Sequence, residues 1–338
     1  MTITRLEHVT PDLLTELLGA TVTEIKARPI GTGQVGATYR LTLSGENGLP
    51  TLVGKFAAAD EFTRNTAIAQ GSYIRETGFY RELARPDLPV PHARHVGLDA
   101  ASHDFALLLD DLTHHRGGDQ LVPLEASEAL AAVDALARIH RSYWGDEKLL
   151  GQGYLPGSRE YLPAPLDPLY EALWPAFLQR YGARVSGQMR AIGDAYRGRC
   201  EQWAAPRPGP KTLVHGDYRH DNLLFGPDGD VVVVDWQTAA IGSGATDLAY
   251  FAGTSLAREW RRAHEVELFE RWLSGLRRDD LDRDQLWRVY RRDAFAGFLM
   301  GVAAAMIVGR TDRGDAMFLS MCERAAAMVV DHDATALI

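Results

Sequence analysis

The stretch HGDYRHDN at residues 215–222, followed by VVVVDW at residues 231–236, decides the fold of this chain. A run of four valines is typical of a buried β-strand, and this run ends in Asp235. Asp217 and Asn222 lie in the preceding loop. Phosphoryl transfer needs one carboxylate at the attacking hydroxyl and oxygen ligands for Mg²⁺, and this stretch supplies both. A polar turn between two strands is the alternative interpretation.

The spacing assigns a role to each polar side chain of this stretch. Asp217 is the expected catalytic base, and Asn222 and Asp235 are the expected ligands of Mg²⁺, as in the catalytic loop and metal-binding Asp of kinases. Arg219, two residues after the base, either contacts the γ-phosphate or the substrate or is a surface charge. A chance polar turn would not also place a glycine loop and a strand Lys upstream in the order that kinases use.

The glycine loop consists of Gly31, Gly33 and Gly36, in the pattern G-x-G-x-x-G. A strand-like alternation follows it, whereas a dinucleotide-binding site would require a helix. A glycine loop between two antiparallel strands covers the ATP phosphates in protein-kinase-like folds, because glycine lets main-chain amides approach closely. Taken alone, the motif is equally compatible with a plain hairpin turn.

Lys55 lies in the strand-like segment 51–59. A Lys that projects from a buried strand needs an anionic partner, and this position suits contact with the α- and β-phosphates of ATP. Its expected protein partner is Glu76 in the next helical segment, with Glu82 as the alternative. A surface Lys on an edge strand is the competing interpretation.

The two parts of the chain have different patterns. Residues 1–110 predict a sheet with one main helix over 67–84, and we expect them to form an N-terminal nucleotide-binding lobe. A short helix is expected before the sheet, with Thr10 as its N-cap, Pro11 at its first position and Gly19 at its end. Residues 111–338 are expected to form a helical C-terminal lobe with the catalytic loop and the acceptor pocket. The helices predicted there cover residues 125–144, about 168–203 and about 256–331.

The motifs His215-Gly-Asp217, Asn222, Asp235-Trp-Gln and Asp247-Leu-Ala-Tyr-Phe251 resemble those of the aminoglycoside phosphotransferase and choline kinase superfamily. HGD in place of HRD is typical of its small-molecule branch, and GFYRELA with DDLTHHRGGDQ is most similar to the ecdysteroid-kinase-like bacterial members. The resemblance runs from about Gly31 to Phe251. It implies an α+β, bilobal protein-kinase-like fold with a small antiparallel-sheet lobe and a larger, mainly helical lobe.

The resemblance also implies ATP and Mg²⁺ as cofactors and further residue roles. Asp247 should brace the catalytic loop through hydrogen bonds. Leu107 and Leu109 should lie in the hinge that contacts adenine, although they are equally compatible with a plain buried strand. Only eleven residues separate Asp235 from Asp247, which leaves no room for a phosphorylatable activation loop. A regulated protein kinase is therefore not expected.

The net charge, the longest uncharged run and the cysteines limit which binding partners and which cellular compartment we expect. The formal net charge of −9 argues against nucleic acid or an anionic membrane as a partner. The longest uncharged run, Ala294–Gly309, is shorter than the roughly 20 residues of a membrane span. Cys200 and Cys322 match no metal spacing and are expected to be reduced thiols. We expect a cytoplasmic monomer or homodimer.

The expected function is an ATP-dependent phosphotransferase with an alcohol group as acceptor. The acidic balance suits a cationic acceptor such as an amino sugar, an aminoglycoside or choline. The apolar run and the tryptophans of the second half suit a hydrophobic alcohol such as a sterol, and the motifs favour this second class. Two alternatives remain open: a nucleotide-binding pseudokinase that acts as a scaffold, and a hydroxyacyl-thioester kinase.

Overall fold

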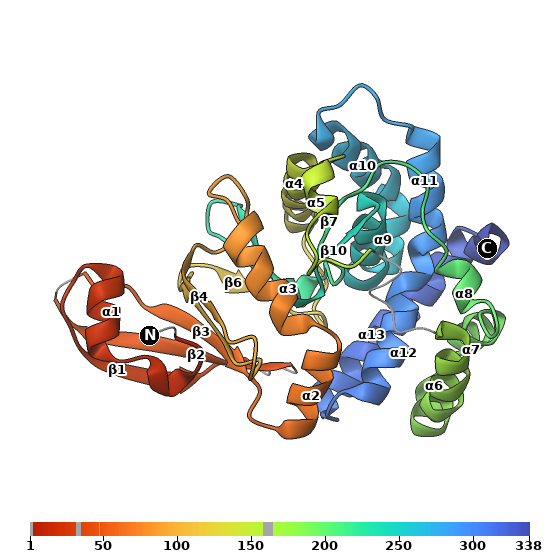
Figure 1. Cartoon of the computed structure of the whole chain (residues 1–338). Helices are drawn as coiled ribbons and strands as arrows, with labels where there is room; N and C mark the ends of the chain where they lie inside the picture. The colour runs from red at the N-terminus through yellow and green to blue at the C-terminus, as the bar shows by residue number, and fades with distance from the viewer. Residues whose placement is uncertain (1–2, 32–34, 47, 158–164) are drawn as a thin grey trace. The chain divides into compact units, whose positions relative to one another are not determined.

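The computed structural model describes residues 3–31, 35–46, 48–157 and 165–338. The chain divides into two compact units. The sheet unit comprises Met1–His115 and Val233–Ala239, and the helical unit comprises Arg116–Val232 and Ala240–Ile338. An antiparallel sheet thus comes first and a mainly helical region follows (Figure 1), which confirms the predicted α+β class.

The sheet unit is built on five antiparallel strands in the order β1-β2-β3-β5-β4. Their bounds are β1 Val22–Pro29, β2 Gly36–Gly45, β3 Leu52–Ala57, β4 Ala93–Leu98 and β5 Phe105–Asp110. Side chains alternate between the two faces of a strand, so Leu52 and Phe56 of β3 enter the core while Lys55 points to the opposite face. The predicted strand that holds Lys55 is therefore confirmed.

Helix α1, Pro11–Leu18, lies against β1 and closes the core of the sheet unit. It begins as the sequence predicts: the Thr10 hydroxyl accepts a hydrogen bond from the main-chain N–H of Leu13, and Pro11 occupies the first turn. It ends at Gly19, which takes a left-handed conformation with φ 66°. Local capping chemistry thus determines both ends.

The single helix predicted over 67–84 is wrong, because the chain breaks at Gly71. Helix α2, Glu61–Ala69, ends there, and α3, Ser72–Gly78, runs on into a π-helical turn at Phe79–Leu83. Gly71 has φ 70°, a conformation that glycine adopts readily and that no helix can continue through. The break lets α3 take its own direction, and nearly all of its residues are buried.

The helical unit contains the predicted long helices, a four-residue helix at Glu147–Leu150 outside their ranges, and one longer helix that the periodicity did not predict. This longer helix, α9 Gly244–Ser255, is buried at every residue except the half-buried Thr246, so it has no polar face to mark it. The other helices are α4 Ala126–Tyr143, α5 Glu147–Leu150, α6 Leu166–Tyr181, α7 Gly187–Ala195, α8 Cys200–Trp203, α10 Arg258–Leu276, α11 Arg283–Arg292, α12 Ala296–Ile307 and α13 Asp312–Asp331.

Short strands flank the loop at residues 215–222. Two small sheets, β7–β10 and β6–β8–β9, are built from β6 Arg116–Gly117, β7 Thr212–Val214, β8 Leu223–Phe225, β9 Val231–Val233 and β10 Ala240–Gly242. The loop 215–222 leaves β7 and enters β8, so strands fix it at both ends.

The predicted buried helix within Ala294–Gly309 is α12, which contacts α6, α9 and α13. Across the described ranges, no helix is both long enough and apolar enough to cross a membrane. Cys200 and Cys322 are both buried and form no disulfide, as expected.

Candidate active site

In the sheet unit, Lys55 is shared by two carboxylates. Its Nζ lies 2.7 Å from Oε2 of Glu76 on α3 and 2.5 Å from Oδ1 of Asp235. Glu82, the alternative partner, is exposed. The arrangement brings together three residues that the sequence singled out.

Burial and the neighbouring charges together shift the pKa values of Lys55 and Glu76. Burial opposes the charge on Lys55, but Asp235 and Glu76 outweigh it and raise the pKa of Lys55. For Glu76, burial dominates over the nearby ammonium and raises its pKa to about 7. Lys55 therefore stays protonated while two carboxylates compete for it, and the ammonium is well placed to exchange one of them for an anionic ligand.

Asp235 follows β9 with φ 69° and ψ 63°, in the left-handed region that Asp tolerates better than most residues. The next residue, Trp236, stacks on Phe79, with ring centroids 3.8 Å apart and ring planes at 6°. Both rings are fully buried. The stacking holds the segment that carries Asp235 against the π-helical turn after α3.

In the helical unit, four contacts hold the Asp217 carboxylate. Arg219 Nε lies 3.1 Å from each of its oxygens, and Asn222 Nδ2 donates to Oδ2 at 2.9 Å. The Tyr250 hydroxyl donates to Oδ1 at 2.7 Å. Each carboxylate oxygen thus receives two donors, which fixes the direction in which the carboxylate points. The sequence places Tyr250 in the motif that begins at Asp247 but gives no sign of its hydrogen bond to Asp217.

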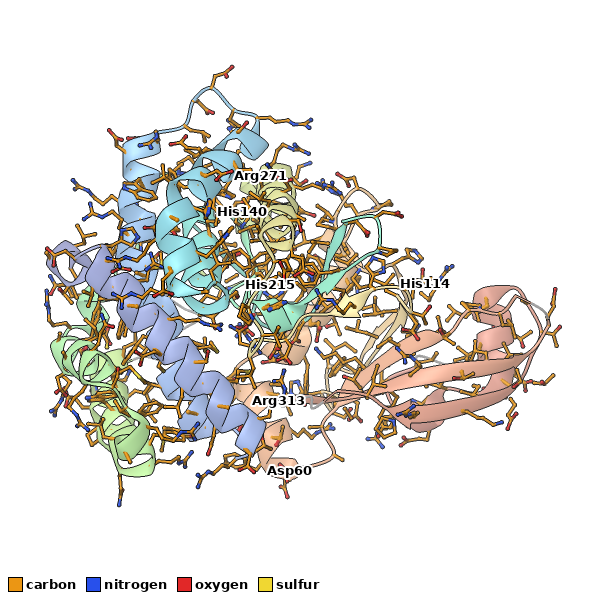
Figure 2. The ribbon with its side chains drawn as sticks, turned by 180° about the vertical axis from the view of Figure 1, so that it is seen from behind. Asp60, His114, His140, His215, Arg271 and Arg313 are labelled. Atoms are coloured by element: carbon orange, nitrogen blue, oxygen red, sulfur yellow. The ribbon has the colours of Figure 1, made fainter. Side chains whose placement is uncertain are left out.

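Arg219 belongs to a chain of alternating charges that ends on α13. Its Nη1 donates to Asp221 at 2.7 Å, and Asp221 in turn accepts from Arg313, which also pairs with Asp119. Burial favours the neutral form of Asp221, but Arg219 and Arg313 outweigh it and lower the pKa of Asp221. Arg313, labelled in Figure 2, is the second residue of α13. The Arg219 side chain is only 15 % exposed, so it is not the plain surface charge considered as one alternative.

Asp247 braces the catalytic loop, as expected from the resemblance. Its carboxylate accepts from the main-chain N–H groups of His215 at 2.6 Å and Gly216 at 3.0 Å. His140 Nε2 lies 3.3 Å from the same carboxylate, and Trp272 donates to the other ring nitrogen, Nδ1, at 3.0 Å. His140 therefore carries its proton on Nε2 and donates it to Asp247. Figure 2 labels both histidines, which come from α4 and from the start of the loop.

The Asp247→Ala variant is expected to lose about 2–6 kcal/mol of unfolding free energy, because the buried N–H of His215 and the partly buried N–H of Gly216 lose their acceptor at roughly 1–3 kcal/mol each. Urea unfolding followed by circular dichroism measures this loss. The matched control is Asp134→Ala, which removes a carboxylate paired with Arg271 at the surface and should change stability by less than about 1 kcal/mol. Equal effects in the two variants would contradict the bracing role.

The other predicted nucleotide-binding residues are the glycines between β1 and the start of β2 and two leucines within β5. Gly31 has φ 71°, and Gly36 opens β2, where a Cβ would lie 2.7 Å from the main-chain oxygen of Phe56, so only glycine fits. Gly33 lies outside the described residues. Leu107 and Leu109 are buried in β5, and Leu107 pairs with Lys55 across the ladder. A contact of the two leucines with adenine stays a prediction.

The donor types at the predicted metal ligands fit Mg²⁺. Asn222 uses its Nδ2 on Asp217, which leaves the amide oxygen as a ligand, and the Asp235 carboxylate is 30 % exposed. Mg²⁺ is typically held by one or two such oxygen ligands together with substrate phosphates. In the described part of the chain, no group of three or more His, Cys, Asp or Glu side chains is arranged for a metal.

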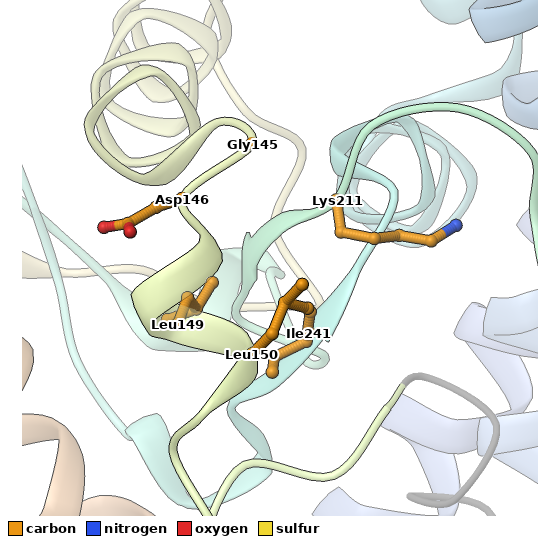
Figure 3. A pocket seen from close by; sticks show the side chains of 6 residues that line it. All are labelled: Gly145, Asp146, Leu149, Leu150, Lys211 and Ile241. Carbon is orange, nitrogen blue, oxygen red and sulfur yellow. The ribbon is translucent and has the colours of Figure 1, made fainter.

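A small pocket of about 80 Å³ lies in the helical unit (Figure 3). It is lined by Gly145, Asp146, Leu149, Leu150, Lys211 and Ile241. None of the predicted site residues lines it, and it is far smaller than the roughly 300–1,000 Å³ of a typical small-molecule site. We assign it no part in the reaction.

Comparisons with known proteins agree with this geometry. A family model described as "Phosphotransferase enzyme family" matches residues 26–290. Among solved structures, an aminoglycoside 2′-phosphotransferase in complex with GDP is 13 % identical, with 96 % of this chain and 99 % of that chain covered and a TM-score of 0.53. An ethanolamine kinase from Plasmodium vivax is 12 % identical, with 89 % and 82 % covered and a TM-score of 0.51. At these identities the two structures show a shared fold.

Two curated proteins match shorter parts of the chain. Acyl-CoA dehydrogenase family member 10 of Mus musculus is 44 % identical over 57 residues, which are 15 % of this chain and 5 % of that protein. Acyl-CoA dehydrogenase family member 11 of Gallus gallus is 28 % identical over 134 residues, which are 38 % of this chain and 15 % of that protein. The matched parts are therefore small fractions of both relatives.

Proposed function

Because this chain belongs to the phosphotransferase enzyme family, whose model matches residues 26–290, we propose that it transfers the γ-phosphoryl group of ATP to a hydroxyl group of a small organic acceptor. The observation that carries the proposal is the Asp217 carboxylate, which Arg219, Asn222 and Tyr250 hold in one orientation. A carboxylate fixed in this way is suited to accept a proton from an attacking hydroxyl.

In the proposed reaction, Asp217 orients the acceptor hydroxyl and takes its proton as the hydroxyl oxygen bonds to the γ-phosphorus. The bond from that phosphorus to the bridging oxygen breaks, and ADP leaves with the bond's electron pair. Catalysis by such sites is mainly positioning and stabilisation of charge. Tyr250 and Asn222 keep the carboxylate turned toward the acceptor throughout.

Nucleotide binding is assigned to the glycine loop and Lys55. Main-chain N–H groups of the loop contact the phosphates, and Lys55 exchanges Asp235 for the α- and β-phosphates while Glu76 keeps it in place. The released Asp235 carboxylate and the Asn222 amide oxygen would then hold Mg²⁺. When bound, Mg²⁺ neutralises phosphate charge. Leu107 and Leu109 are assigned to the adenine site.

The charges beside Asp217 bear on the acceptor. Asp221 is already ion-paired with Arg219 and Arg313, and Asp119 is ion-paired with Arg313. A cationic amino sugar or choline would have to compete with these guanidinium groups for the same carboxylates. The pairing favours an uncharged acceptor, such as a hydrophobic alcohol, or an anionic one. The likeness of GFYRELA and DDLTHHRGGDQ to ecdysteroid-kinase-like members supports the hydrophobic alcohol.

A hydroxyacyl thioester is the second candidate acceptor. The observation that favours it is that both curated relatives carry acyl-CoA dehydrogenase in their names. A coenzyme A thioester is anionic, which agrees with the neutralised carboxylates beside the base.

Phosphoryl transfer from ATP and from GTP, each with Mg²⁺, to a panel of acceptors tests the proposal. The panel contains sterols, hydroxyacyl-CoA thioesters, aminoglycosides, amino sugars and choline. A phosphorylated product made by the wild type identifies the acceptor class. Nucleotide binding without transfer to any acceptor and without slow ATP hydrolysis would overturn the kinase assignment in favour of the pseudokinase scaffold.

A further inference from the structure

The hydroxyl of Tyr73 joins the start of β2, where the glycine loop ends, to the end of β3. Tyr73 lies on α3, and its hydroxyl donates to the main-chain oxygen of Val35 at 2.8 Å. The hydroxyl oxygen of Tyr73 in turn accepts a hydrogen bond from the main-chain N–H of Ala58 at 3.0 Å. Val35 precedes β2 and Ala58 follows β3, so one side chain bridges both strand ends.

The Tyr73 bridge takes the place of one further residue pair between β2 and β3. The ladder between β2 and β3 ends with Gly36 opposite Ala57. Val35 and Ala58 would form the next pair, and the Tyr73 hydroxyl lies between the N–H of one and the C=O of the other. The tyrosine therefore ends the β2–β3 ladder at a defined residue and holds these two strands apart where the glycine loop ends.

Burial makes this bridge a strong constraint. Tyr73 is 4 % exposed and Ala58 is 7 % exposed, so water has little access to the Ala58 N–H. The Tyr73 ring also packs on Phe105, with centroids 4.5 Å apart. Without the hydroxyl, the Ala58 N–H either stays unpaired or pairs with Val35 as the ladder extends, and in both cases the start of β2 loses its hydrogen bond to α3.

We propose that Tyr73 is a positioning residue for nucleotide binding, which fixes the described end of the glycine loop relative to Lys55. This inference rests on the proposed function, in which that loop and Lys55 contact the phosphates of ATP. Glu76, which holds Lys55, lies three residues after Tyr73 on the same helix. Helix α3 thus positions the Lys and the loop together.

Tyr73→Phe tests the inference, because it removes the hydroxyl and keeps the ring against Phe105. Its Kd for Mg²⁺-ATP is expected to rise about tenfold, the effect of losing one to two hydrogen bonds from the bridge. The rate of acceptor-independent ATP hydrolysis at saturating ATP should stay within about twofold of wild type, because the bridge is proposed to act on nucleotide binding and not on the base, Asp217. A purely structural role would lower the unfolding temperature and leave Kd unchanged.

Tyr80→Phe is the matched control. Tyr80 follows α3 and is also buried, but its hydroxyl has no hydrogen-bond partner in the described part of the chain. Its Kd should equal that of wild type. Equal Kd values for Tyr73→Phe and wild type would overturn the inference. If the wild-type protein bound no nucleotide, the result would contradict the proposed function itself and not only the role of Tyr73.

Hydrogen exchange on wild type gives a reading that does not depend on how the variant folds. The Ala58 amide should exchange at least about 100-fold more slowly than in an unstructured peptide, because a buried hydroxyl is its acceptor. An Ala58 amide that exchanges at the unprotected rate would overturn the bridge.

Discussion

The Asp217→Asn variant is expected to lose about 10²- to 10⁴-fold in kcat, the usual contribution of general-base assistance, and to keep its affinity for nucleotide. The amide keeps the size of the carboxylate but cannot take the proton of the acceptor hydroxyl. Arg219 retains Asp221 as a partner at 2.7 Å, so no buried guanidinium loses its last carboxylate. The loss should therefore fall on the chemical step and not on folding.

Single-turnover transfer from ³²P-labelled ATP measures the chemical step, and calorimetric titration measures nucleotide binding. Asp228→Asn, in the exposed turn between β8 and β9, is the matched control and should behave as wild type. Wild-type kcat in Asp217→Asn would refute the role of Asp217 as the base.

Asp235→Asn is expected to lower the Mg²⁺-dependent affinity for ATP on the order of 100-fold. The amide is a weaker ligand for a hard cation, and the several kcal/mol of charge neutralisation that the metal provides would be lost with it. The fold should tolerate the change, because Lys55 keeps Glu76 at 2.7 Å and Trp236 keeps its stacking on Phe79.

The comparison of ATP binding with Mg²⁺ and with EDTA isolates this effect. In EDTA, wild type and Asp235→Asn should bind ATP equally weakly, and only wild type should gain affinity when Mg²⁺ is added. An equal gain in both proteins would place the metal on other residues. The same titration with Asp228→Asn controls for the loss of one negative charge.

Sequence patterns predicted the elements whose signals are local. The alternation around Lys55 predicted β3, and Thr10, Pro11 and Gly19 predicted both ends of α1. The motif resemblance predicted that Asp247 would brace the loop. In each case, neighbouring residues or a fixed spacing determine the outcome, so no tertiary contact had to be known.

The features that the sequence did not predict depend on contacts between residues far apart in the chain. Tyr250 meets Asp217 only because α9 is buried beside the loop, and a helix without a polar face gives no periodic signal. The bridge from Tyr73 to Val35 and Ala58 needs the β2–β3 register as well as the break at Gly71. A tyrosine on the apolar stripe of a predicted helix is interpreted as a core residue, and its neighbours in the sequence do not identify the partners of its hydroxyl.

The sheet unit contains Val233–Ala239, a segment synthesised long after the rest of that unit. A nascent chain that has reached His115 carries all five strands of the sheet, but Phe79 has no indole to stack on and Lys55 has one carboxylate in place of two. Domains generally fold as units during synthesis, from the N-terminus onward. Here the ribosome must first translate through residue 239, so this unit is completed late, and a fragment cut at residue 115 is not an independent version of it.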